Sequence, residues 1–155
     1  MRKLKGLLMI SIALLLVSCS MSAKTEEKNE QTATKGEVIV LNNAEFISKV
    51  YNYELNKDNW VYEGDKPCII DFYADWCGPC KKVAPILKEL ALLYKDDIII
   101  YKVNVDQEKE LAEAFGIQSI PTILFVPAKG KPQMAQGALP REEFVKQIDS
   151  FLLNK

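Results

Sequence analysis

The segment 68–105 constrains the fold more than any other part of the chain. Two runs, CIIDFYA at 68–74 and IIIYKVNV at 98–105, are apolar on both alternations, as strands buried on both faces of a sheet are. Between them, apolar residues recur in steps of three and four, which predicts an amphipathic helix containing Pro85. They are Val83, Ile86, Leu87, Leu90, Ala91 and Tyr94. The segment therefore predicts a strand–helix–strand unit.

Shorter patterns on either side of this unit predict further strands and helices. In chain order they are a strand at 37–41, a helix at 42–51 capped by Asn42 or Asn43, a helix at 107–116 closed by Gly116, a hairpin of strands at 122–126 and 132–136, and a helix at 141–153 with Pro140 at its first turn. Strands that alternate with helices and end in a hairpin and a helix predict an α/β sandwich with a central mixed sheet.

The N-terminus has the pattern of an export signal. Basic residues precede GLLMISIALLLV, an apolar run that is shorter than the roughly 20 residues needed to span a bilayer. The run ends in Val17-Ser18-Cys19, which resembles a bacterial lipoprotein signal, where a small residue precedes the cysteine that receives the lipid. We therefore expect a lipoprotein-type signal peptide at 1–18 and lipidation of Cys19.

The alternative to lipidation is ordinary cleavage after Ala23, which would give a soluble periplasmic protein. It would put Met21 at a position that prefers small side chains. The following residues up to 36 carry no aromatic and no branched aliphatic side chain, so they cannot bury enough apolar surface to order themselves. We expect residues 19–36 to be a lipidated cysteine and a flexible tether, and residues 37–155 to be the folded domain.

The composition excludes several classes of chemistry. The chain has 155 residues, no histidine, and a formal net charge of −1 with acidic and basic residues interleaved. Histidine-dependent general base catalysis and histidine-containing zinc sites are therefore excluded, and no basic stripe indicates a nucleic-acid partner. The four cysteines remain as candidates for metal or redox chemistry; they are Cys19, Cys68, Cys77 and Cys80.

The sequence ADWCGPCK at 74–81 places two thiols three positions apart. A structural zinc site needs four ligands, and the remaining cysteines offer no second pair. A structural disulfide here would close a loop too short to constrain much of the unfolded chain. The pair sits where a buried strand gives way to a helix, so Cys77 would lie at the helix N-terminus, which stabilises a thiolate. This placement favours redox chemistry and no metal.

At this point the chain resembles the thioredoxin family. DFYADWCGPCK is similar to the family's active-site signature, KVNVD to its next central strand, SIPT to its substrate-facing loop, and Gly137-Ala138-Leu139 continues the match. The resemblance covers about residues 37–153. It implies a thioredoxin fold, protein-disulfide reduction, disulfide-containing protein substrates, and no bound cofactor.

The resemblance also implies roles for individual residues. Cys77 would attack and Cys80 would resolve, forming the redox-active pair. Asp71 would be a general base with a raised pKa that takes the proton of Cys80, although a buried acid satisfied by backbone donors is the alternative. Lys102 would be the partner of Asp71, with a solvated lysine as the alternative.

Substrate contacts follow from the same resemblance. Trp76, Gly78 and Pro79 would shape the exposed disulfide. Ile120 precedes Pro121, which the family has in the cis form, and the backbone there would pair with an extended substrate segment.

The direction of electron flow and the location are less directly indicated. The Gly78-Pro79 pair lacks the histidine of disulfide isomerases and of oxidising family members, and a nearby carboxylate favours the reducing direction. We expect a reductase on the periplasmic side of a bacterial membrane, held by a lipid anchor and supplied by a membrane or thioredoxin-reductase-type electron donor. An electron donor for cytochrome c maturation and a non-catalytic binding module on the same fold are the alternatives.

Three features depart from the family pattern. Residues 51–66 form a longer connection than small thioredoxins have, and their aromatic residues would either pack as an outer flap or meet a partner; we expect packing. Tyr73 stands where many relatives have tryptophan. Cys68 lies about 20 Å from Ala74 along an extended strand, so it cannot join the active pair. We expect it to be an inert core thiol rather than a regulatory one.

Overall fold

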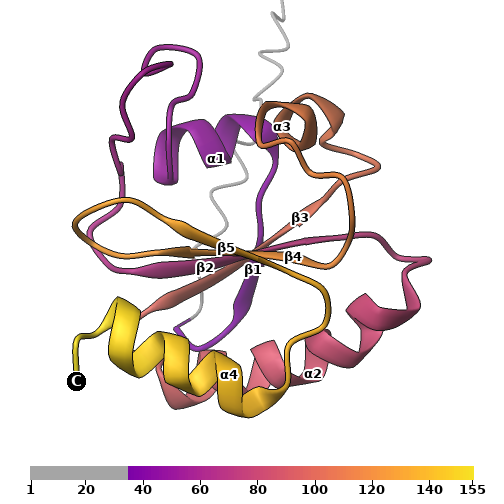
Figure 1. Ribbon diagram of the computed structural model, residues 1–155, viewed down its shortest axis with the longest axis vertical. Helices are drawn as coiled ribbons and strands as arrows, with labels where there is room; N and C mark the ends of the chain where they lie inside the picture. Colours follow the sequence, from indigo (N-terminus) through magenta and orange to yellow (C-terminus); the bar gives the residue numbers. More distant parts are fainter. Residues whose placement is uncertain (1–34) are drawn as a thin grey trace, which may run out of the picture. The chain divides into compact units, whose positions relative to one another are not determined.

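Residues 35–155 are described by the structure, a computed structural model, and they form one five-stranded sheet with helices on both faces (Figure 1). The signal peptide, the lipidation of Cys19 and nearly all of the tether fall outside these residues. The elements are β1 (Val38–Val40), α1 (Asn43–Lys49), β2 (Cys68–Tyr73), α2 (Gly78–Leu93), β3 (Ile99–Asn104), α3 (Lys109–Ala114), β4 (Thr122–Val126), β5 (Gln133–Gln136), α4 (Arg141–Lys146) and a terminal π-helix η1 (Gln147–Leu152).

The sheet is mixed, as predicted, with the strand order β1-β3-β2-β4-β5. β1, β3 and β2 run parallel, whereas β4 and β5 are antiparallel to their neighbours. The central strand β2 has five fully buried residues followed by a half-buried Tyr73. Its lack of apolar–polar alternation is therefore explained by helices covering both of its faces.

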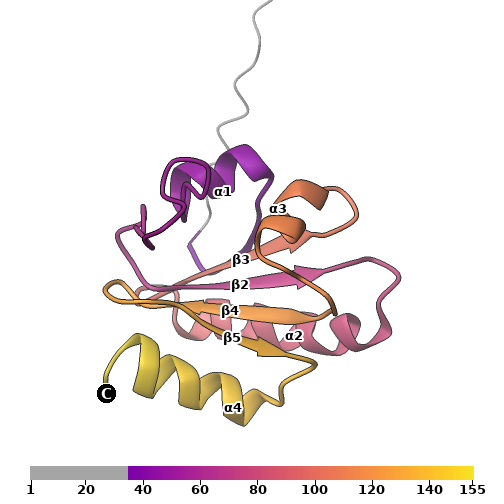
Figure 2. The same cartoon turned by 45° about the horizontal axis from the view of Figure 1, so that its top comes forward.

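Two hydrophobic cores lie on opposite faces of the sheet. One contains Ile69 of β2 with Leu87 of α2 and Phe144 of α4. The other contains Ile70 of β2 with Phe46 of α1. Figure 2 shows α2 and α4 on one side of the strands and α1 and α3 on the other. Successive residues of β2 thus point into different cores. Asp71, two positions after Ile69, therefore points toward α2.

The first helix begins at a capping box formed by Asn42 and Glu45. The side chain of Asn42 accepts a hydrogen bond from the amide of Glu45 at 2.9 Å, and the Glu45 carboxylate accepts one from the amide of Asn42 at 3.2 Å. This reciprocal pair satisfies two amides that a helix start otherwise leaves free. Asn42, rather than Asn43, is therefore the cap.

The C-terminal helix differs from its prediction. An α-helix was expected over 141–153, but the hydrogen-bond pattern widens after Lys146, and the amide of Leu153 bonds to the carbonyl of Ile148 at 2.9 Å. Ile148 and Leu152 of this segment both lie in the core beneath the sheet, and their spacing of four positions would put them on one face of an α-helix as well. The apolar spacing is therefore compatible with either kind of turn and does not predict the wider one.

The segment 51–66 packs as an outer flap, as expected. Tyr51 stacks on Trp60 with ring centroids 4.3 Å apart, and both rings pack against the core on the α1 side of the sheet. The Tyr53 hydroxyl donates a hydrogen bond to the Asn43 side chain at 2.7 Å. Within residues 35–155, no helix is long and apolar enough to cross a membrane.

Candidate active site

The two cysteines of the WCGPC sequence form a disulfide at the start of α2. The Cys77–Cys80 bond has an S–S distance of 2.09 Å and a Cα–Cα distance of 5.3 Å. The expectation of an exposed disulfide was wrong: each cysteine is only 3% exposed, whereas the intervening Gly78 and Pro79 are exposed. Cys68 is the one free thiol of residues 35–155.

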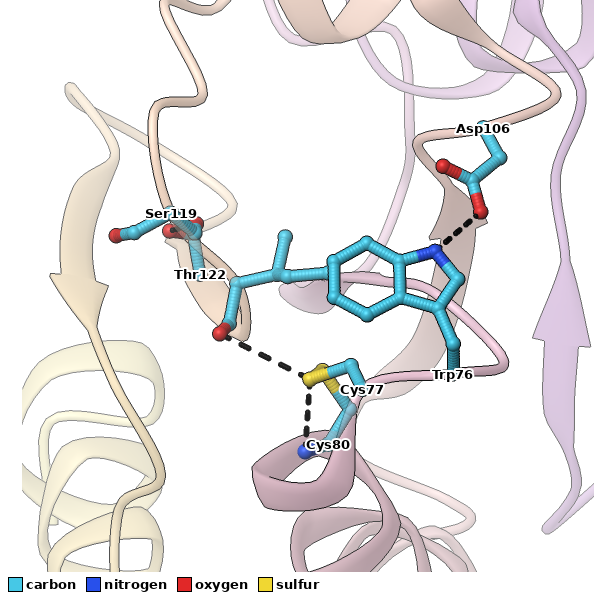
Figure 3. The surroundings of a disulfide bond; sticks show 7 residues. Trp76, Cys77, Cys80, Asp106, Ser119 and Thr122 are labelled. Atoms are coloured by element: carbon cyan, nitrogen blue, oxygen red, sulfur yellow. Dashed lines mark hydrogen bonds between the residues drawn. A yellow bond between two sulfur atoms is a disulfide. The ribbon is translucent and has the colours of Figure 1, made fainter.

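The helix start gives the two sulfur atoms unequal surroundings. Cys77 is the N-cap of α2, and its Sγ accepts a hydrogen bond from the amide of Cys80 at 3.1 Å (Figure 3). Pro79 lies in the first turn, where its missing amide costs the helix no hydrogen bond. Negative charge on Cys77 would therefore be stabilised by an amide and by the helix dipole. Cys80, one turn further, has no such donor pointing at it from the helix start.

The loop before β4 approaches the disulfide. The Ile120–Pro121 peptide bond is cis, as the resemblance implied. The carbonyl oxygen of Ile120 lies 3.8 Å from Cys77 Sγ, a contact that a dashed line from Cys77 marks in Figure 3. Because a disulfide sulfur carries no proton, this contact becomes a hydrogen bond only after reduction. The loop is braced by the Thr122 hydroxyl, which donates to the Ser119 carbonyl at 2.7 Å.

Trp76 forms the exposed wall of the site. It is 70% exposed, and its indole N–H donates to Asp106 Oδ2 at 2.8 Å (Figure 3). The Asn104 side chain accepts from the amide of Asp106 at 3.0 Å and donates to the Asp75 carboxylate at 3.3 Å. The large ring is thereby held in one orientation beside the disulfide.

The sequence analysis missed Asp106, Asn104 and Asp75 as residues of the site. A signal for them was available, because Asp75 follows β2 closely, Asn104 ends β3 and Asp106 follows it. The carboxyl ends of neighbouring parallel strands meet at the same edge of a sheet, so polar residues there converge.

Asp71 is a buried acid on the α2 side of β2. It is 4% exposed, and its Oδ1 has no hydrogen-bond partner among the described residues. Burial raises the pKa of this carboxyl to about 7, while the positive charge of Lys102 acts in the opposite direction. Backbone donors do not satisfy Oδ1, so the alternative of a fully bonded structural acid finds no support there.

A cavity of about 480 Å³ opens beside Asp71 between α2 and the sheet. Its lining includes Lys102, Lys88 of α2 and Glu37 ahead of β1, together with the apolar side chains of Leu87 and Leu92. The cavity gives a buried carboxyl access to a partly polar space. The two lysines make that space more favourable for a carboxylate.

Lys102 is close to Asp71 in the sheet without forming an ion pair with it. The two residues are register partners on β2 and β3. The Lys102 ammonium lies 5.0 Å from the centroid of the Tyr73 ring, a cation–π contact that the sequence analysis missed. Lys102 is thus placed where its charge lowers the pKa of Asp71 from a distance.

Cys68 lies at the opposite end of β2 from the disulfide. It is fully buried, it pairs in register with Val126, and burial raises the pKa of its thiol to about 12. Within residues 35–155, no group of three or more histidine, cysteine, aspartate and glutamate side chains is arranged to hold a metal ion. The geometry separates Cys68 from the redox pair, as expected.

Comparisons with known proteins decide the family. A family model described as Thioredoxin matches residues 37–150. The chain belongs to the thioredoxin family. It is 45% identical over 113 residues to a thioredoxin of Borreliella burgdorferi, covering 73% of this chain and 96% of that protein. Thioredoxin 1 of Nostoc is 38% identical over 92 residues, covering 59% of this chain and 86% of that protein.

A solved structure of a thioredoxin also resembles the fold. Chloroplastic thioredoxin z superposes with a TM-score of 0.57 at 26% identity, covering 72% of this chain and 94% of that chain. Membership of the family, together with the cysteine pair, makes this thioredoxin-family protein a protein-disulfide oxidoreductase. The separate roles of Cys77, Cys80, Asp71 and the substrate contacts stay predictions.

Proposed function

We propose that this protein is an exported, lipid-anchored thiol-disulfide reductase that acts on protein disulfides outside the cytoplasm. The observation that carries the catalytic part is the disulfide at the start of α2, with Cys77 beside the Ile120 carbonyl and the amide of Cys80. The observation that carries the location is the sequence of the first 19 residues, which has the pattern of a lipoprotein signal.

In the first step, the reduced enzyme attacks its substrate. The Cys77 thiolate bonds to one sulfur of a substrate disulfide, and the other substrate sulfur leaves as a thiolate. The amide of Cys80 supports the charge on Cys77 before the attack. The exposed Trp76 ring lies beside the disulfide (Figure 3), and the Ile120 carbonyl is 3.8 Å from the reacting sulfur. These two groups hold the substrate chain beside Cys77.

In the second step, Cys80 resolves the mixed disulfide. Asp71, a carboxyl whose pKa of about 7 suits proton transfer near neutral pH, accepts the proton of the Cys80 thiol. The resulting thiolate bonds to Cys77, and the second substrate sulfur leaves as a thiolate. The substrate gains two electrons, and the enzyme ends as the Cys77–Cys80 disulfide seen in the structure.

The cycle closes when a reductase-type donor returns two electrons and two protons to the pair. Thioredoxins act on disulfide-containing proteins and draw on donors of this kind. An exported protein needs a donor that delivers electrons across or within the membrane. The reducing direction is supported by the Gly78-Pro79 pair, since no cation between the two cysteines stabilises the thiolate form, and by the nearby Asp71 carboxyl.

Turbidimetric reduction of insulin by dithiothreitol tests the activity. The full chain should accelerate precipitation, and Cys77→Ser should abolish the acceleration. Ser119→Ala, near the site but outside the reacting atoms, is the matched control and should retain most of it. An unchanged rate with the parent protein would leave a binding module as the better account of the fold.

A further inference from the structure

A groove of about 510 Å³ lies on the face of the sheet opposite α2, away from the disulfide. Aromatic residues of the flap 51–66, together with Phe115 after α3, form the walls of the groove. The sheet lines it with Leu124 of β4 and its register partner Met134 of β5. The aromatic residues are Tyr51, Tyr53, Trp60 and Phe115. A volume of this size suits one or two large side chains.

The walls of this aromatic groove are already fixed without an occupant. Tyr51 stacks on Trp60, and its hydroxyl donates to the carbonyl of Asn56 within the flap. Tyr51 and Tyr53 both meet Phe115 edge to face, at centroid distances of 6.3 and 6.2 Å. A groove held open by such contacts loses little conformational entropy when it binds.

The groove adjoins an unpaired strand edge. β5 is the outermost strand of the sheet and pairs only with β4, so its other edge presents free backbone donors and acceptors. Met134 on this strand is 43% exposed although it is large and apolar. An extended peptide could therefore add to β5 and place alternate side chains in the groove.

The same strand leads toward the disulfide. Gln136, two residues after Met134, pairs with Thr122, and the amide of Gly137 bonds to the carbonyl of Pro121 at 2.8 Å. Two strand residues span about 7 Å. A segment of roughly four to six extended residues would connect a substrate cysteine near Ile120 to a side chain in the groove.

The polar groups of the groove indicate what kind of segment fits. Lys57 is the one charged residue among the described residues that line it. The indole N–H of Trp60 is shielded from solvent and has no acceptor within the described part of the chain. A carboxylate near an apolar side chain would complement the lysine.

We propose that the aromatic groove is a second substrate contact, which binds an extended acidic-aromatic segment of the disulfide-containing protein a few residues from its reactive cysteine. This inference rests on the proposed reductase function and adds the substrate class to it. Proteins that carry a large apolar side chain beside a carboxylate at that spacing are reduced in preference to others.

A set of chromogenic mixed disulfides tests the proposal. Each peptide carries one cysteine joined to 5-thio-2-nitrobenzoate, with Phe-Glu placed three to seven residues before or after it, and Ser-Ser in the matched peptides. We expect one spacing at which Phe-Glu raises kcat/KM by about tenfold over Ser-Ser, through KM rather than kcat. The mixed disulfide of free cysteine with 5-thio-2-nitrobenzoate, which carries no peptide, measures the rate of reduction without any contact in the groove.

Two pairs of variants locate the effect in the groove. Met134→Glu should remove the Phe-Glu advantage, because it places a carboxylate in the groove, whereas Gln133→Glu, its neighbour on the opposite face of β5, should keep it. Lys57→Glu should reverse the preference from Phe-Glu to Phe-Lys, whereas Lys129→Glu, which does not line the groove, should not. An exposed edge strand accepts charged side chains, so these variants should fold.

Each outcome bears on one of the two claims. Failure to reduce the mixed disulfide of free cysteine would overturn the proposed function. Normal reduction with no advantage at any spacing, or an advantage that survives Met134→Glu, would overturn the groove proposal alone. Competition by phosphatidylglycerol vesicles that Met134→Glu abolishes, in the absence of any peptide preference, would assign the groove to lipid and overturn it as well.

Discussion

Asp71 and Lys102 are register partners on adjacent parallel strands, yet their side chains do not form an ion pair. Lys102 instead lies over the ring of Tyr73, 5.0 Å from its centroid. The charge of Lys102 therefore acts on Asp71 only from a distance, and burial is the larger influence on the pKa of the carboxyl. Because the lysine lowers the pKa of Asp71 without binding it, the carboxyl is free to take and release a proton.

Stability should depend on pH through Asp71. Its pKa is raised from 3.8 to about 7 by burial, so its contribution to stability is complete below about pH 4 and is lost as the pH rises through about 7. Asp71→Asn removes the buried charge and keeps the shape. At pH 8 the variant should be more stable than the parent by about 2–4 kcal/mol, and the difference should vanish toward pH 4. Urea unfolding at pH 4, 6 and 8 measures this, and equal differences at all three values would contradict it.

The same substitution should slow the release step. Without the general base, the escape of substrate from the Cys77 mixed disulfide should fall by at least about tenfold near pH 7, while the first attack is unchanged. Single-turnover kinetics with a fluorescent disulfide separate the two steps. Unaltered kinetics from pH 6 to 9 would favour a purely structural role for the acid.

Lys102→Met should move the pH dependence of release to higher pH. The cation lowers the pKa of Asp71, so its removal lets burial raise that pKa further. Lys129→Met, in the β4–β5 turn, is the control and should leave the profile in place. If the pH dependence of release is unchanged in Lys102→Met, the lysine contributes through its contact with Tyr73 rather than through its charge.

Cys80→Ser should accumulate substrates as covalent adducts on Cys77. The first attack needs only Cys77 at the helix start, and release needs Cys80, so the two variants should behave differently. Cys77→Ser is the control and should trap almost nothing. Adducts identified by mass spectrometry from exported material would be varied for a broad reductase and confined to apocytochromes and their handling proteins for a cytochrome-specific donor. Equal trapping by both variants would refute the assignment of roles.

Cys68→Val should leave activity unchanged and stability within about 1.5 kcal/mol of the parent. The thiol is fully buried, with a pKa of about 12, so iodoacetamide should label the reduced pair long before it labels Cys68. Labelling of Cys68 at a comparable rate in native protein would show that this end of β2 opens readily.

Cys19→Ser should abolish lipid labelling and membrane attachment in the producing cell while the purified protein keeps its insulin reductase activity. The reason is that residue 19 precedes the folded domain in the chain. Membrane fractionation and radiolabelled palmitate provide the readouts, with Ser20→Ala as the neighbouring control. Equal membrane attachment of parent and variant would point to ordinary cleavage after Ala23.

The fold was predictable because its strongest signals are local. The buried run of β2, the helical periodicity of α2 and the capping residue Asn42 each depend on residues close together in the chain. The placement of Cys77 at a helix start follows from the same patterns. The cis form of Pro121 came from the family resemblance rather than from any local signal.

What escaped prediction depends on contacts between distant parts of the chain. The contact of Trp76 with Asp106 joins residues 30 positions apart in the chain. The position of Lys102 over Tyr73 requires knowing that the two strands are in parallel register. The aromatic groove needs the flap, the end of α3 and β5 to meet, and the wider turns of η1 have no signal in the apolar spacing of that segment.

The two active cysteines are three positions apart within one helical turn, with their Cα atoms 5.3 Å apart. Side chains at that spacing are already neighbours on a helix, so opening the bond requires little movement of the backbone. We therefore expect the surface around the disulfide to be nearly the same in the oxidised and reduced states. An electron donor and a substrate would then meet the same surface at the disulfide, and the redox state of the pair would decide which of them reacts. An excess of either partner would block the other there and slow electron transfer.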